Sequence, residues 1–105
     1  MTASLLRIFA EEGKRLDRRP LHEAIVMRAL QAGLAGATVL RGPMGYGRHA
    51  RVHSARLADL TPKLPLVIEI VDAEERLRPF AEAMAALAEV GLVTLEKVEV
   101  IAREG

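Results

Sequence analysis

The run Leu66-Val67-Ile68-Glu69-Ile70-Val71 constrains the fold more than any other segment of this sequence. Its nearly continuous apolar and β-branched residues are typical of a strand at the centre of a sheet. The chain has 105 residues, which leaves room for one domain with one hydrophobic core. We therefore expect residues 1–105 to form a single domain around this central strand.

The other apolar segments complete a strand-helix-strand-strand-helix-strand order. Strands are predicted at 5–10, 36–42, 66–71 and 92–101, and helices at 20–33 and 72–91. Asp72 followed by Glu75 indicates a capping box at the start of the second helix. Pro79 then means either that this helix is kinked or that its regular part begins at Pro79 itself.

Short connections and right-handed crossovers turn this order into an α+β fold. The prediction is a ferredoxin-like βαββαβ sandwich, in which a four-stranded antiparallel sheet has both helices on one face. Segments 5–10 and 66–71 would be its central strands, and they are also the two most apolar strands. The other sheet face has no helix to cover it, and its apolar content favours packing against another subunit.

Composition excludes several functions that this fold can serve. The absence of cysteine removes disulfides, thiolate metal sites and thiol nucleophiles. Phe9, Tyr46 and Phe80 are the only aromatic residues, too few for a base-stacking platform, so nucleic acid is not an expected partner. No apolar run approaches the ~18 residues of a membrane span and no signal peptide is recognisable, so we expect a cytoplasmic protein that is not embedded in a membrane.

The charge distribution points to the middle of the chain. Residues 41–63 carry five bases and one acid, whereas residues 64–105 carry four bases and nine acids. Pro43, Gly45 and Gly47 interrupt regular structure there, so we expect a long mobile loop at about residues 46–64. The arginines of residues 41–63 form either an anion-binding funnel or merely a solvated mobile loop; they are Arg41, Arg48, Arg51 and Arg56.

Three further polar side chains invite a functional interpretation. Glu69 lies within the apolar central strand, where a carboxylate needs a partner. We expect a salt bridge from Glu69 to a basic residue of an adjacent strand or subunit rather than a catalytic role. His49 and His53 are four residues apart, but only Asp59 is near enough in sequence to be a third ligand, so no metal site is expected.

Four stretches, which together cover essentially the whole chain, resemble the DUF190 family of small bacterial and archaeal proteins. They are PLHEAI at 20–25, GLAGATVLRGPMGYG at 33–47, LPLVIEIVD at 64–72 and GLVTLE at 91–96. More distantly, GATV at 36–39 followed by GYGR at 45–48 is similar to the segment that leads into the T-loop of PII signalling proteins. PII proteins are trimers that bind adenine nucleotides between their subunits.

The PII resemblance implies a set of ligand-binding residues. Thr38 would lie near an adenine, while Gly45, Gly47 and Arg48 would approach the nucleotide at the base of the loop. Glycine lets main-chain N–H groups come close to an anion, and a guanidinium matches phosphate geometry. The alternative for Gly45 and Gly47 is a structural role at an ordinary exit from a strand, in which glycine permits a positive φ.

Two features depart from the PII pattern. This chain has one more residue between Gly36 and Gly45 than PII has. PII also carries a glycine-rich phosphate-binding loop after its second helix, whereas residues 89–93 supply one glycine and no lysine.

The resemblance implies a homotrimeric regulatory protein rather than an enzyme. It would bind a small anionic ligand, with an adenine nucleotide as the candidate, at clefts between subunits. Its 46–64 loop would contact a membrane transporter or an enzyme. Two alternatives stay open, a structural trimeric adaptor without a small ligand and an enzyme that acts on a small anionic substrate through Arg48 and His49. Nothing in the sequence pairs a nucleophile with an oriented base, and a dimer stays the alternative to a trimer.

Overall fold

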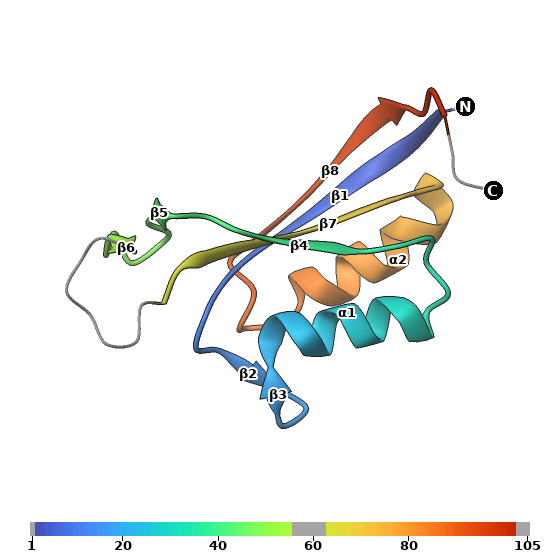
Figure 1. Cartoon of the computed structure of the whole chain (residues 1–105). Coiled ribbons are helices and arrows are strands. Elements are labelled where there is room, and N and C mark those ends of the chain that lie inside the picture. Colours follow the sequence, from blue (N-terminus) through green and yellow to red (C-terminus); the bar gives the residue numbers. More distant parts are fainter. Residues whose placement is uncertain (1, 56–62, 103–105) are drawn as a thin grey trace.

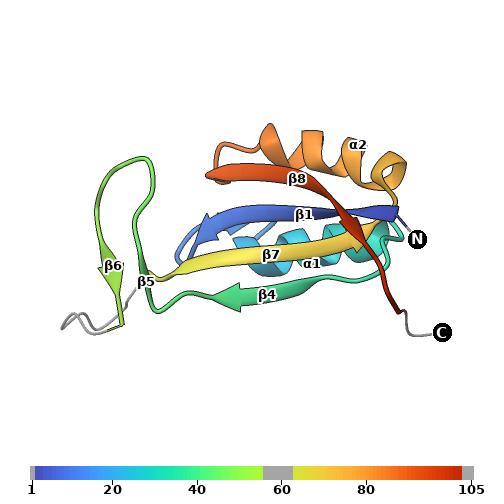
Figure 2. The same ribbon diagram turned by 90° about the horizontal axis from the view of Figure 1, so that it is seen from above.

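The computed structural model of the protein describes residues 2–55 and 63–102. Its main sheet has the strand order β4-β7-β1-β8, and all neighbouring strands are antiparallel. These strands are β1 (Thr2–Glu11), β4 (Thr38–Arg41), β7 (Pro65–Asp72) and β8 (Leu92–Glu99). The helices are α1 (Leu21–Gln31) and α2 (Glu74–Ala85). Both helices lie against the same face of the sheet, as Figures 1 and 2 show.

This architecture confirms the predicted α+β fold with a βαββαβ core, and β1 and β7 are the central strands as expected. The core lies between the sheet and the two helices, because alternate side chains of the central strands point toward the helices. Leu6, Ile8, Ile68 and Ile70 supply the sheet side and are at most 1% exposed. Leu21, Ile25, Leu77 and Met84 supply the helix side and are equally buried.

Helix α1 ends at a glycine in the left-handed region. Gly33 has a φ of +74°, and its N–H donates to the carbonyl of Leu30, while the N–H of Leu34 donates to the carbonyl of Ala29. Only glycine reaches this conformation without a steric cost, so Gly33 fixes where the helix stops and where the chain turns back toward β4.

The start of helix α2 differs from the prediction. No capping box forms, since the N-cap residue is Ala73 and no side chain caps the helix. Asp72 instead accepts hydrogen bonds from the N–H of Ala73 at 2.7 Å and from the N–H of Ala35 at 3.0 Å, which ties the α1–β4 connection to the start of α2. The regular helix begins at Glu74, so Pro79 lies inside it, and the alternative of a helix starting at Pro79 is wrong.

Two short hairpins were not predicted from the sequence. The first pairs β2 (Arg15–Leu16) with β3 (Arg19–Pro20) just before α1. The second pairs β5 (Met44–Gly45) with β6 (His53–Ser54). The first half of the predicted loop at 46–64 is therefore a hairpin, whereas the stretch 56–62, with Arg56 and Asp59, lies outside the described residues.

Candidate functional site

A cavity of about 760 Å³ lies at the end of the sheet where β1 and β4 finish and β7 begins. It is lined by the β5–β6 hairpin, the end of β1, the start of β7 and the α2–β8 connection. One group of lining side chains is basic and comprises Lys14, Arg48, Arg51, Lys63, His49 and His53. A second group is apolar and comprises Phe9, Pro65, Leu66, Val90 and Leu92. The lining also includes two carboxylates, Glu11 and Glu89.

Glu12 holds the walls of this cavity together. Its N–H donates to the carbonyl of Leu64 at 3.0 Å, and its carboxylate accepts from the N–H of Leu64 at 3.2 Å. The same carboxylate pairs with Arg41 at 2.8 Å. On the other side, the N–H of Gly91 donates to the carbonyl of Phe9, which fixes the α2–β8 connection against β1. Segments that are distant in the sequence are thus joined into one wall by hydrogen bonds.

The structure brings three of the four predicted site residues together. Gly45, Gly47 and Arg48 all line the cavity. Thr38 does not line it, because it lies at the opposite end of β4, where it is paired with Glu69 of β7. Directly opposed residues of antiparallel strands share a face of the sheet, so Thr38 lies on the face that has no helix.

The backbone conformation at Gly45 and Gly47 argues against the alternative in which these glycines only permit a positive φ at the exit of a strand. In the described residues only Gly13 and Gly33 are glycines with positive φ, so neither Gly45 nor Gly47 is needed for a left-handed conformation. Packing explains Gly45, since a Cβ there would lie 3.0 Å from Cγ of Pro65. A Cβ at Gly47 would meet nothing within 4 Å, so no contact within the described chain requires glycine at that position.

The arginines of the basic segment do not all face the cavity. Arg48 and Arg51 line it, whereas Arg41 is engaged by Glu12 outside it. Of the two alternatives for these arginines, the funnel therefore does not include Arg41, which serves as a structural ion-pair partner. Nε2 of His53 lies 3.7 Å from Oε2 of Glu11, and His49 lines the same cavity. Among residues 2–55 and 63–102, no three His, Asp or Glu side chains come close enough together to hold a metal ion.

Sequence reasoning missed Lys14 and Glu89, and it did not single out Lys63. Lys14 follows β1, Lys63 precedes β7 and Glu89 follows α2, so these residues meet only because the sheet places three chain turns at one end. Local patterns in the sequence carry no signal for such a meeting. The basic composition of residues 41–63 was the one available hint, and it pointed to Lys63 alone.

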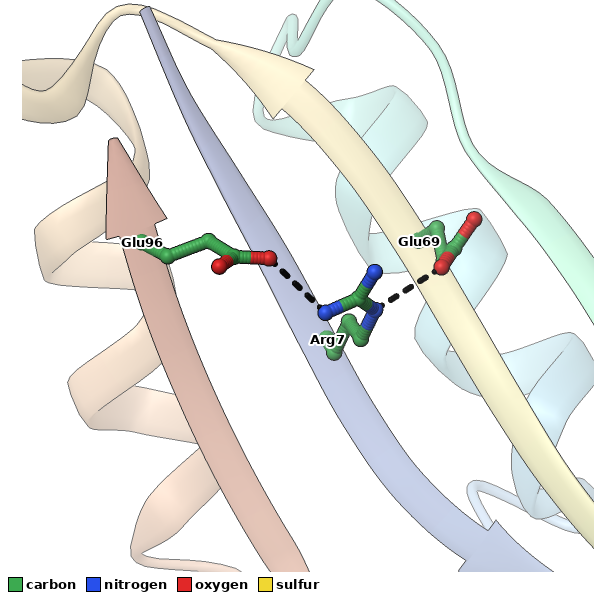
Figure 3. Close-up of polar contacts among 3 residues, drawn as sticks. All are labelled: Arg7, Glu69 and Glu96. Carbon is green, nitrogen blue, oxygen red and sulfur yellow. Dashed lines mark hydrogen bonds and ion pairs between the residues drawn. The ribbon is translucent and has the colours of Figure 1, made fainter. Parts of the chain in front are cut away.

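A second polar cluster lies on the sheet face without helices (Figure 3). Arg7 of β1 bridges Glu69 of β7 at 2.9 Å and Glu96 of β8 at 2.8 Å. This confirms the expected salt bridge of Glu69 to an adjacent strand. The hydrogen bond that Arg7 donates to Glu69 is the main reason that the pKa of Arg7 lies above its ordinary value, with Glu96 adding to it.

Apolar side chains surround this ion cluster on the same face. Leu40 is 49% exposed, Val71 42% and Leu92 55%. We call this surface the open face, and it comprises the outward side chains of β1, β4, β7 and β8, including Leu5, Arg7, Phe9, Thr38, Leu40, Val67, Glu69, Val71, Leu92, Thr94 and Glu96. In the part of the chain that the structure describes, no helix is long and apolar enough to cross a membrane.

Comparison with solved structures places the fold among PII-like proteins. CPII, described as a nitrogen regulatory PII-like protein from Thiomonas intermedia K12 and solved with ADP, AMP and bicarbonate, superimposes with a TM-score of 0.72. It is 22% identical in sequence, and the match covers 95% of this chain and 89% of that protein. A second structure of CPII, bound to ADP and bicarbonate, gives a TM-score of 0.69.

Sequence relatives cover nearly the whole chain. A UPF0166 protein of Aquifex aeolicus is 41% identical over 97 residues, which is 92% of this chain and 91% of that protein. A UPF0166 protein of Methanocaldococcus jannaschii is 33% identical over 75 residues, which is 71% of this chain and 68% of that protein. The model of the family DUF190, described as "Uncharacterized ACR", matches residues 3–100. The chain therefore belongs to the DUF190 family.

Proposed function

We propose that this protein is a PII-like regulatory protein that binds a small anionic ligand, an adenine nucleotide being the best candidate, in the cavity at the base of the β5–β6 hairpin. Its assembly would be a homotrimer, and the 46–64 loop would report ligand occupancy to a membrane transporter or an enzyme. The proposal is supported by the PII-like fold, and by ADP and AMP in the structures of CPII, which shares that fold.

One observation carries the proposal: the cavity is lined by both cationic and apolar side chains. The basic side chains of Arg48, Arg51, Lys14 and Lys63 outnumber the two lining carboxylates. Phe9, Val90 and Leu92 offer apolar surface to a purine ring. A nucleotide has these two parts in one molecule, and a volume of about 760 Å³ is in the usual range for a small-molecule site.

In this assignment Arg48 pairs with a phosphate group, because a guanidinium fork binds phosphate oxygens in a bidentate way. Gly47 lets the main chain approach the same phosphate, since no neighbouring atom within 4 Å would otherwise explain the missing side chain. Lys14 and Lys63 would supply the charge that the α2–β8 connection lacks. Ligand binding would order the loop, which is how occupancy could be read by a partner.

The open face supports the assembly part of the proposal. Apolar side chains as exposed as those of Leu40 and Leu92 favour burial against another copy of the sheet. Thr38 lies on this face, so a subunit boundary there is the arrangement in which Thr38 could join a ligand site shared by two subunits. Thr38 stays a predicted ligand residue on this basis.

Isothermal titration calorimetry with AMP, ADP and ATP tests the ligand part of the proposal. Arg48→Ala should weaken nucleotide binding by about tenfold or more, because a charge-assisted hydrogen bond to phosphate is lost. Arg78→Ala is the matched control, since Arg78 pairs with Glu74 on helix α2, away from the cavity. Gly47→Ala should weaken binding without lowering the melting temperature, and Gly36→Ala, also in open space, should change neither.

The same titrations separate the alternatives. A stable oligomer that binds none of the nucleotides contradicts the ligand assignment and favours a structural adaptor. Steady conversion of the nucleotide, lost in Arg48→Ala, would favour an enzyme instead.

A further inference from the structure

We propose that the β2–β3 hairpin is a docking surface for an acidic segment of a partner protein. Its basic residues are Arg15, Arg18 and Arg19, with Lys14 at its base. Lys14 also lines the cavity, whereas Arg15, Arg18 and Arg19 do not, so the docking surface consists of these three arginines and the inference does not rest on the proposed function. Figure 1 shows the hairpin beyond the first turn of α1, away from the sheet.

The three hairpin arginines have no ion-pair partner among the described residues, whereas most of the other described arginines have one. Among the described residues, Arg7, Arg28, Arg41, Arg76 and Arg78 all pair with carboxylates. The described arginines without such a pair gather in two places, the cavity (Arg48 and Arg51) and this hairpin (Arg15, Arg18 and Arg19). An unpaired cluster of like charge repels itself, so a partner that neutralises it gains binding energy.

Asp17 does not offset this charge. It sits in the turn between Arg15 and Arg18, but its carboxylate is engaged by Arg28 of helix α1 at 3.1 Å. The hairpin therefore presents its three arginines with its own acid already neutralised.

The backbone of the turn also indicates a role for the side chain of Arg18. Asp17 has a φ of +54° and Arg18 a φ of +63°, as in a type I′ turn, whose second central position strongly favours glycine. Arginine at that position raises the energy of the turn relative to glycine. A residue that carries a conformational cost in a well-paired element indicates selection for its side chain rather than for the fold.

Hydrogen bonds and apolar packing hold the hairpin in place. The N–H of Leu21 donates to the carbonyl of Lys14, and Nη2 of Arg15 donates to the carbonyl of Arg18 at 2.8 Å. Leu16 packs against the hydrophobic core, which anchors the hairpin from beneath. A rigid element presents guanidinium groups with less loss of conformational entropy on binding than a flexible tail would.

The chemistry of the tip favours carboxylates of a protein segment over a lipid surface or a nucleic acid. The turn carries no exposed apolar or aromatic side chain that could insert into a bilayer or stack on a base. Guanidinium groups match carboxylates geometrically, because each can donate two parallel hydrogen bonds. An extended acidic segment is the partner that such a narrow, convex and cationic surface fits.

Fluorescence anisotropy with a labelled oligoglutamate peptide tests the proposal, with an oligoglutamine peptide as the uncharged probe. The double variant Arg18→Gln/Arg19→Gln should bind the acidic peptide about tenfold more weakly at low salt. The matched double variant Arg78→Gln/Lys97→Gln removes the same charge elsewhere and should stay within about twofold of the unchanged protein. Equal loss in both doubles would mean that net charge alone acts, and would overturn the proposal.

Two further variants locate the effect. Arg48→Ala should leave peptide binding unchanged, because the cavity is a different surface; loss of peptide binding in Arg48→Ala would overturn the hairpin assignment. The hairpin double should keep any nucleotide affinity, so failure of the hairpin proposal and failure of the ligand proposal are seen in separate titrations. Hairpin-dependent binding to phosphatidylserine vesicles without peptide binding would show a membrane site and would also overturn it.

Arg18→Gly distinguishes a binding role from a structural one. Glycine suits the turn better than arginine, so this variant should raise the melting temperature while it weakens peptide binding. A lower melting temperature together with unchanged peptide binding would show that Arg18 serves the fold and would contradict the proposal.

Discussion

The two faces of the main sheet differ in how far their side chains are buried. On the helix side, Leu6 and Ile8 of β1 are completely buried beneath α1 and α2. On the open face of the same strand, Arg7 reaches to both neighbouring strands, and Val71 and Leu92 nearby keep 42% and 55% of their surface. Both faces are rich in apolar residues, but in the part of the chain that the structure describes only the helix-side face is covered by helices.

This difference indicates that one face of the sheet stabilises the subunit and that the other is available for contact with a second protein. The covered face supplies the hydrophobic stabilisation of the subunit, since burial of apolar side chains is the dominant favourable term in folding. The open face adds little to the folded subunit while it is exposed. Its apolar rim around an ion cluster is suited to a second protein surface, in which the ions would fix the register.

Removing core volume should have the largest effect. Ile8→Ala leaves a cavity between β1 and the helices and should lower the free energy of unfolding by about 2–5 kcal/mol. Val71→Ala, on the open face, should lower it by about 1 kcal/mol or less. Chemical denaturation at one protein concentration measures both. Similar losses from the two variants would show that the faces are not distinct in the folded subunit.

Reversing a charge on the open face should affect assembly more than folding. Arg7→Glu places three carboxylates together where Arg7 now bridges Glu69 and Glu96, so association of the subunits should weaken by about tenfold or more. Light scattering coupled to size-exclusion chromatography measures the oligomer. Arg78→Glu on helix α2 is the control and should keep the assembly. An unchanged oligomer in Arg7→Glu would place the interface elsewhere.

The smallest effect should come from the helix end that holds α1 on the covered face. Gly33→Ala forces a Cβ into the left-handed region and should cost about 1 kcal/mol, visible as a lower melting temperature. Gly36→Ala in the same connection has no positive φ and no neighbour within 4 Å, so it should cost nothing. Equal shifts in the two variants would contradict the role given to the Gly33 cap.

The order of the main elements could be predicted because each rests on a local pattern. The nearly continuous apolar run at 66–71 predicts a strand that is central in the sheet. Because side chains of a strand alternate between its two faces, the same run also predicts which of its residues share a face. The partner of Glu69 was predictable in kind, since a carboxylate in an apolar strand needs a cation. Its identity as Arg7 depended on the pairing of β1 with β7, which no local pattern reveals.

The errors have similar physical causes. Asp72 was expected to form a capping box at the start of α2, but Ala73 is the N-cap residue, and the carboxylate of Asp72 also accepts a hydrogen bond from the N–H of Ala35. The β2–β3 hairpin escaped notice because its turn uses Asp17 and Arg18 where Asn-Gly is the usual signal. Of the residues that line the cavity, Gly45, Gly47 and Arg48 were predicted as ligand residues from the resemblance to PII, whereas Lys14 and Glu89 join them only through the sheet topology.

Native mass spectrometry of the purified protein, alone and with AMP, ADP and ATP, is the decisive test of the proposed trimer and its nucleotide site. We expect a trimer held through the open face that gains up to one nucleotide mass per subunit. Gain of nucleotide should fall in Arg48→Ala while the trimer persists. A monomer, or a trimer to which none of the nucleotides adds mass, would show that the proposed function is wrong.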